Sequence, residues 1–252
     1  MTRAPGWEML RRATPAQRRL RMRLMIGAVA GLVIAVPVVV AALLVRSNWG
    51  PLRRLDLAVA NDLNAFALDH PRYVDLLKFG AIALDPWVYR FAALILVVVL
   101  LRRGAHRLAW WAAVTTIAGG LAGVLLKFIV GRARPTFADA VVTAPSSSFP
   151  SGHALNSAVV TAVILLAILP ALPRVRWRVV AVMTGAALVA ATGYDRIGLG
   201  VHYLSDVLAG WCTATAIVVA TTIAFETWQR HEGAPVGDVL HGIDPDESER
   251  LT

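Results

Sequence analysis

The stretch that decides the fold class is Leu24–Val45, which reads LMIGAVAGLVIAVPVVVAALLV and holds 22 residues without a charge. A helix of that length is about 33 Å long at ~1.5 Å per residue, enough to cross a hydrocarbon core of about 30 Å. Pro37 is tolerated in a membrane helix, where neighbouring groups satisfy the freed carbonyl. A cleaved signal peptide is the alternative, but this run is long and more such runs follow.

Five further apolar runs predict the rest of the fold. Apolar residues make up 57% of the chain and charged residues 16%, whereas soluble domains carry about a quarter charged residues. Exposed strands cannot satisfy their backbone in lipid, so the runs predict an all-α polytopic membrane protein with six transmembrane helices in a bundle. The second run could begin near Phe79, with Asp85-Pro86 breaking or kinking its start. The five runs are Trp87–Leu101, Leu108–Val130, Ala154–Leu169, Val179–Gly193 and Tyr203–Phe225.

Composition divides the chain into three parts. Residues 1–23 form a basic N-terminal segment, residues 24–228 the membrane domain, and residues 229–252 a polar tail that we expect to be disordered. The single cysteine, Cys212, excludes an internal disulfide and a zinc–cysteine cluster. The net charge of +9 could indicate nucleic-acid binding. However, the arginines are spread over membrane flanks and form no continuous patch, so we expect no nucleic-acid partner.

The distribution of basic residues predicts the orientation. Arginines concentrate before the first run, between the second and third, and between the fourth and fifth, and these positions fall on one side of a six-span bundle. We therefore expect an integral protein of the plasma membrane with both termini in the cytoplasm. The segment 46–78 mixes basic and acidic residues and is predicted to be a surface-lying amphipathic stretch or loop. The two basic links contain Arg102, Arg103 and Arg107, and Arg174, Arg176 and Arg178.

Three polar clusters remain at the opposite ends of the predicted spans. They are Lys127-x6-Arg134-Pro135, Pro150-Ser151-Gly152-His153 and Arg196-x5-His202-x3-Asp206. Each has an ordinary explanation when taken alone: cations at a membrane interface, a capped helix start, and a structural His–Asp hydrogen bond. Ionisable residues at membrane depth nevertheless favour function, and the six-span arrangement places all three clusters on the outer face.

The chemistry of these residues suits a phosphate group. A helix that begins at Ser151 presents N–H groups to an anion, and Gly152 allows close approach to the backbone. Four residues separate His202 from Asp206, so on a helix the carboxylate can fix the imidazole tautomer and leave the other nitrogen free to attack. If the helix continues past Lys127, that lysine and Arg134 share one face, and Pro135 ends the helix.

The three spaced motifs, in this order over Lys127–Gly210, resemble the type 2 phosphatidic acid phosphatase superfamily. The resemblance implies that His202 is the nucleophile, that Asp206 orients it and that His153 protonates the leaving oxygen. It also implies a phosphate-binding set of Lys127, Arg134, Ser151, Gly152 and Arg196. The family's third motif usually begins Ser-Arg, whereas here it begins Asp195-Arg196. We expect Asp195 to turn away from the phosphate and support a cation; the alternative is that it points into the site.

The function implied is hydrolysis of a lipid phosphate or diphosphate through a phosphohistidine, without metal or cofactor and with inhibition by vanadate. Polyprenyl diphosphates such as undecaprenyl diphosphate, phosphatidic acid and phosphatidylglycerol phosphate are all open as substrates. The alternatives are a lipid phosphotransferase and a catalytically impaired lipid-binding or transport protein. The expected partners are the lipid phosphate substrate and the surrounding membrane lipids.

The predicted orientation can be tested by thiol labelling. A cysteine introduced into the loop 138–148 should react with an impermeant thiol reagent on intact cells, because that loop is predicted to be external. A cysteine in the Arg102–Arg107 link should be protected. The reverse pattern of labelling contradicts the orientation.

Overall fold

The structure is a computed structural model that describes residues 35–231 together with Asp244 and Glu247. The regular secondary structure in these residues is α-helical, as the sequence predicts. A first helix, Ala35–Arg46, precedes the labelled ones. These are α2 (Gly50–Asp69), α3 (Pro71–Ala83), α4 (Pro86–Arg102), α5 (His106–Val130), α6 (Gly152–Ile168), α7 (Val175–Gly198) and α8 (Leu204–His231).

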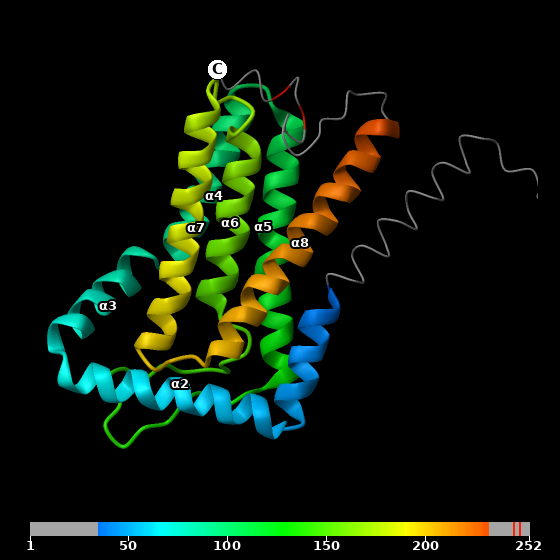
Figure 1. The fold of residues 1–252 in the computed structure, drawn as a ribbon. Coiled ribbons are helices and arrows are strands. Elements are labelled where there is room, and N and C mark those ends of the chain that lie inside the picture. The colour runs from blue at the N-terminus through cyan, green and yellow to red at the C-terminus, as the bar shows by residue number, and fades with distance from the viewer. Residues whose placement is uncertain (1–34, 232–243, 245–246, 248–252) are drawn as a thin grey trace, which may run out of the picture.

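Helix α6 lies at the centre of the bundle, packed against α4, α5, α7 and α8 (Figure 1). Its side chains Leu155, Val159 and Val163 join Trp111 of α5 in the main core cluster. With 17 residues, α6 is about 26 Å long at ~1.5 Å per residue, shorter than a hydrocarbon core of about 30 Å. Because other helices enclose it, α6 does not need to match the thickness of the lipid.

The outward faces of the helices carry large apolar side chains, as a lipid-facing surface does. On α5 these include Leu121, Val124 and Phe128, the last 88% exposed. An apolar surface this extensive marks contact with lipid or protein rather than water. By length and hydropathy four spans are candidates among the described residues, and a fifth if Ala35–Arg46 and α2, bent by 86°, count as one. The shorter α6 adds to these, so the predicted count of six is approximate.

Segment 46–78 is helical except at residues 47–49 and His70. Helix α2 lies across one end of the bundle and contacts α7 and α8, while α3 leans against α7 (Figure 1). The predicted break at Asp85-Pro86 is observed: Pro86 begins α4, and the Asp85 carboxylate accepts from the backbone N–H of Trp87 at 2.8 Å. A proline at this position loses no helical hydrogen bond, which explains why a new helix begins here.

Two helix ends matter for the polar clusters: α5 ends at Val130, as the predicted run does, whereas α7 extends beyond its predicted end at Gly193. Helix α5 does not continue to Arg134, because Gly131 adopts a left-handed conformation with φ of 61° and its N–H bonds to the carbonyl of Lys127. Glycine adopts this conformation without a steric penalty, so it ends the helix before Pro135 can. Helix α7 extends to Gly198, so Asp195 and Arg196 lie in its last turn rather than between two spans.

The two basic links lie together at the other end of the bundle, where α4 leads to α5 and α6 leads to α7 (Figure 1). Two acidic residues of the predicted tail are also found there. Arg107 pairs with Asp244 at 2.8 Å, and the N–H of Leu108 donates to Glu247 at 2.9 Å, which caps α5. The basic segment 1–23, the first half of the Leu24–Val45 run and most of the tail lie outside the described residues.

Adjacent glycines of α5 provide a matched test of the packing. A Cβ at position 119 would lie 3.0 Å from the side chain of Val159 in α6, whereas one at position 120 would meet nothing within 4 Å. We expect Gly119→Leu to destabilise the protein by about 1–3 kcal/mol through overpacking. Gly120→Leu should leave stability equal or raised by up to about 1 kcal/mol, since glycine weakens a helix interior. Thermal unfolding in detergent measures both, and equal melting temperatures would contradict this packing.

Candidate active site

The three polar clusters meet at one end of the bundle. The C-terminal ends of α5 and α7 lie there beside the N-terminal ends of α6 and α8, because successive helices run antiparallel (Figure 1). A cavity of about 410 Å³ opens at this end. Its polar lining includes Arg134, His153, Arg196 and His202. The order of helices therefore joins residues from three separate motifs in one cavity.

His202 lies in the link between α7 and α8, and its surroundings determine its tautomer. Nε2 lies 3.2 Å from Nη1 of Arg134, and a guanidinium only donates, so Nε2 is the acceptor. The proton is then on Nδ1, which faces the carboxylate of Asp206 at 3.5 Å, slightly beyond a normal hydrogen bond. The lone pair of Nε2 thus points to the side where Arg134 lies.

The charge state of His202 follows from its burial. Its side chain is 3% exposed, and this burial lowers the pKa of the imidazole below its ordinary value of 6.5. Asp206 acts in the opposite direction, and the cations Arg134 and Lys127 lower the pKa further. His202 is therefore neutral near pH 7, the state that a nitrogen nucleophile requires.

A turn at Gly200 brings His202 back to the cavity. Gly200 has a φ of 69°, and a Cβ there would lie 2.8 Å from the ring of Phe137. After this turn the backbone N–H groups of Val201 and His202 both bond to the carbonyl of Arg196, at 3.2 and 3.3 Å. The last turn of α7 thus fixes the position of the histidine that follows it.

The start of α6 has the capped form that the sequence predicts. The hydroxyl of Ser151 accepts from the N–H of Ala154 at 3.4 Å, so this side chain is engaged in the cap. A Cβ at Gly152 would lie 3.9 Å from Cε of Lys127, which places the lysine beside the helix N-terminus. Nζ of Lys127 donates to the carbonyl of Ser147 at 2.5 Å. Lys127 therefore meets this end of α6 although α5 ends before Arg134.

Arg134 is held by the loop and by the link that carries His202. Its Nε donates to the carbonyl of Ser146 at 3.0 Å, and its Nη1 donates to the carbonyl of Val201 at 2.6 Å. Two backbone carbonyls thus aim one edge of the guanidinium at His202. An arginine fixed in this way presents its remaining N–H groups as a planar fork for an oxyanion.

His153 and Arg196 form a second pair on the cavity wall. Nη1 of Arg196 lies 3.1 Å from Nε2 of His153, and the carboxylate of Asp85 lies 3.8 Å from the same nitrogen. Because the guanidinium donates, Nε2 of His153 is an acceptor in this arrangement. Asp85 caps α4 and was not identified as a site residue from the sequence, where an Asp-Pro pair indicates a helix start and nothing more.

Asp195 contacts Arg196 and does not line the cavity. Nη2 of Arg196 donates to one carboxylate oxygen of Asp195. The other oxygen faces α3, where a Cβ at position 80 would approach it to 3.0 Å. The two residues are neighbours on a helix, yet the long arginine side chain folds back to reach the carboxylate. This geometry supports Asp195 as a partner of Arg196.

A model of the PAP2 superfamily matches residues 108–230, a range that contains all three clusters. The chain belongs to the PAP2 superfamily. Phosphatidylglycerophosphatase B of Bacillus subtilis (strain 168) is 40% identical over 88 residues, 34% of this chain and 43% of that relative, so the match spans less than half of the relative's length. The crystal structure of the first transmembrane PAP2-type phosphatidylglycerolphosphate phosphatase from Bacillus subtilis superposes with a TM-score of 0.63. It is 21% identical, covering 81% of this chain and 97% of that chain, and the likeness concerns the fold.

In this PAP2 protein the cavity has an apolar wall that the sequence motifs do not include. Its residues come from α3, from the loop before α6 and from the end of α7, three segments without a common sequence signature. They are Ala81, Ile82, Val142, Ala144, Leu199 and Val201. Lys78 of α3 adds a further cation to the lining. Among the described residues there is no group of three or more His, Cys, Asp or Glu side chains that could hold a metal ion.

The contact between Asp195 and Arg196 can be tested by anion binding. If the carboxylate orients Arg196, Asp195→Ser should reduce the rise in melting temperature that inorganic phosphate or vanadate gives to the protein in detergent. Asp62→Ser, an exposed site on α2, is the control and should respond like the wild type. A larger anion-induced rise in Asp195→Ser would show that the carboxylate opposes the anion instead.

Proposed function

We propose that this PAP2 protein hydrolyses a phosphate ester or anhydride on a membrane lipid through a phosphohistidine at His202. The observation that carries the proposal is the cavity itself, where Nε2 of His202 and the forks of Arg134 and Arg196 face apolar side chains from α3 and α7. Such a cavity suits an amphiphile whose charged group meets the cations while its chain follows the apolar wall. The site lies at the end of the bundle opposite the arginine-rich links, which favours an external position at the plasma membrane.

The first half of the reaction uses His202 as the nucleophile. The lone pair of Nε2 attacks phosphorus and forms the N–P bond, while the bond from phosphorus to the lipid oxygen breaks and its electron pair leaves with that oxygen. Asp206 stabilises the positive charge that develops on the imidazole. Arg134, Arg196 and Lys127, with the N–H groups at the start of α6, stabilise the equatorial oxygens.

His153 would supply the proton to the leaving oxygen. In the present arrangement Arg196 donates to Nε2 of His153, so a phosphate group must first attract the guanidinium. Nε2 can then take up a proton from solvent, with the carboxylate of Asp85 3.8 Å away. In the second half His153 removes a proton from water, the oxygen attacks phosphorus, and the N–P bond electrons return to His202.

Three cations would take the place of metal ions in this mechanism, so activity should persist in EDTA. Phosphate release from a panel of lipid phosphates, measured with purified protein in detergent, tests the function. Phosphatidylglycerol phosphate is the first substrate to try because of the relatives' names, followed by phosphatidic acid and undecaprenyl diphosphate. Loss of activity in EDTA with recovery in magnesium contradicts metal independence. Transfer of label to an acceptor lipid would indicate a phosphotransferase.

The two histidines should respond differently to the leaving group. His202→Ala should abolish turnover of every substrate and the acid-labile phosphoprotein, because no N–P bond can form. His153→Ala should slow formation of the phosphoprotein from a lipid ester by about 100- to 10,000-fold but spare its formation from p-nitrophenyl phosphate, whose leaving oxygen needs no proton. Hydrolysis of the phosphoprotein should be slow with both substrates, because His153 also activates the water. His106→Ala, at the other end of the bundle, is the control. Equal losses in the rate of phosphoprotein formation from both substrates in His153→Ala would exclude the general-acid role.

A further inference from the structure

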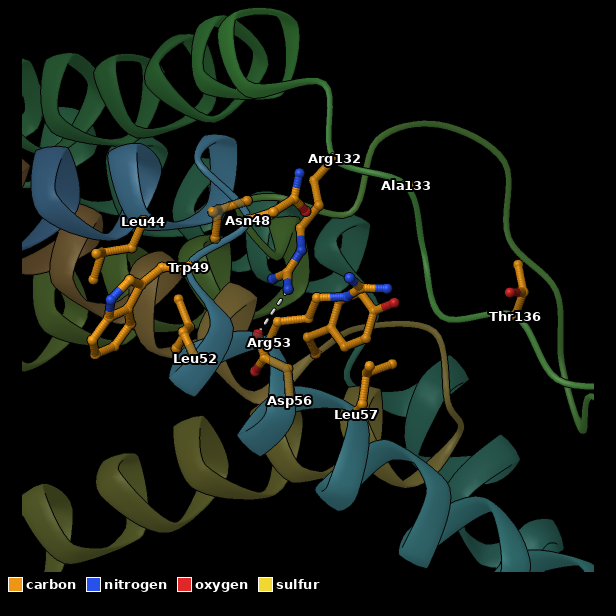
Figure 2. A pocket seen from close by; sticks show the side chains of 12 residues that line it. Leu44, Asn48, Trp49, Leu52, Arg53, Asp56, Leu57, Arg132, Ala133 and Thr136 are labelled. Atoms are coloured by element: carbon orange, nitrogen blue, oxygen red, sulfur yellow. Dashed lines mark hydrogen bonds and ion pairs between the residues drawn. The ribbon is translucent and has the colours of Figure 1, made fainter.

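Asp56 of α2 is a carboxylate that the proposed mechanism does not use, yet it is 1% exposed. It lies outside the range 108–230 that matches the family. A buried carboxylate is costly unless it is paired and hydrogen-bonded. Asp56 is both: Nη2 of Arg132 lies 2.7 Å from Oδ2, and the hydroxyl of Ser205 donates to the same oxygen at 2.6 Å. Figure 2 shows Arg132 reaching from the loop to Asp56 beside a cavity of about 300 Å³.

Asp56 also caps the helix that carries Asp206. The backbone N–H of Ser205 donates to Oδ1 of Asp56 at 3.0 Å. Ser205 is in the first turn of α8, where N–H groups have no carbonyl partner within the helix. A carboxylate from α2 satisfies one of them and is favoured there by the helix dipole. The position of α8 along the bundle is therefore fixed partly from α2.

Arg132 links Asp56 to Asp206. Its Nη2 bonds to Asp56, while its Nη1 donates to Oδ1 of Asp206 at 2.6 Å and to the hydroxyl of Ser205 at 2.8 Å. The guanidinium carbon lies 4.0 Å from the ring centroid of Tyr203, so Arg132 packs on this ring in addition to forming its hydrogen bonds. A planar fork held at both ends has one orientation, and that orientation determines where the Asp206 carboxylate sits.

Asp206 connects Arg132 to His202. Its side chain is fully buried, and its Oδ2 accepts from the N–H of Tyr203 at 2.9 Å and faces Nδ1 of His202. We propose that Asp56 is a positioning residue for the nucleophile, acting on His202 through Arg132 and Asp206. The proposal rests on the function proposed above and assigns to α2 a part in the reaction.

The charge of Asp56 matters as well as its shape. Arg132 is shared between two carboxylates, so its positive charge does not fully compensate Asp206. If Asp56 becomes neutral, Arg132 compensates Asp206 alone, and the surroundings of His202 become more positive. The imidazole is then a weaker nucleophile, and the charge that develops on it during phosphoryl transfer is less stabilised. The phosphate-binding cations Arg134, Arg196 and Lys127 are untouched by this change.

Steady-state kinetics separates positioning from a general structural role. Asp56→Asn keeps the shape of the side chain and removes its charge. We expect kcat on a lipid phosphate to fall by about 10- to 100-fold, as for other groups that orient a functional side chain, with KM unchanged. Asp62→Asn makes the same charge change at an exposed site on α2 and should behave as the wild type. A wild-type kcat in Asp56→Asn, or a rise in KM that accounts for the loss, overturns the proposal.

The rate at which diethyl pyrocarbonate carbethoxylates His202 measures the nucleophilicity of this imidazole and requires no turnover of substrate. Peptide mass spectrometry should show slower labelling of His202 in Asp56→Asn than in Asp62→Asn, with His106 as the internal reference. Unchanged labelling of His202 shows that Asp56 only caps α8 and overturns the proposal. If the wild type hydrolyses no lipid phosphate, the proposed function fails, while this labelling rate still decides the role of Asp56.

Discussion

The buried carboxylate of Asp206 is the group on which the arrangement of this end of the bundle depends. It cannot remain ionised there without a compensating charge, and Arg132 provides that charge at 2.6 Å. Arg132 comes from the loop after α5 and also binds Asp56 of α2 at 2.7 Å. One ion-pair network thus joins the loop, α2 and α8. His202 takes its orientation from the same network, because Asp206 faces its Nδ1.

The bilayer explains why so much polar chemistry is concentrated at one end. Within the hydrocarbon every backbone group must bond inside its helix, so free N–H groups and flexible loops occur only where helices begin and end. The site uses these positions: the start of α6, the left-handed end of α5 and the turn after α7. The wall of the cavity, which includes Ile82 and Leu199, is apolar, like the lipid-facing surface of the helices. A cationic end and an apolar wall together favour an amphiphilic anion over a soluble one.

Helix α6 shows how packing sets what hydropathy leaves open. Its 17 residues are fewer than a full crossing of the hydrocarbon core needs, and four neighbouring helices surround it. Close contacts such as that of Val159 with Gly119 hold it in register with α5. His153 is the second residue of α6, so this packing also decides where that imidazole lies relative to Arg196. The precision of the site therefore derives from the most enclosed helix of the bundle.

The sequence by itself determined the all-α membrane class, the approximate spans and the three motifs, because hydropathy and short spacing are local properties. It left open whether the helix continues to Arg134, since Lys127 and Arg134 fit a helical spacing that Gly131 interrupts. It gave no sign of Asp56, which stands among exposed charges of α2 and contacts Ser205, 149 positions further along the chain. Asp85, Lys78 and the apolar wall were hidden for the same reason. A contact between distant segments has no local pattern, and only the packing of the helices decides which charges meet.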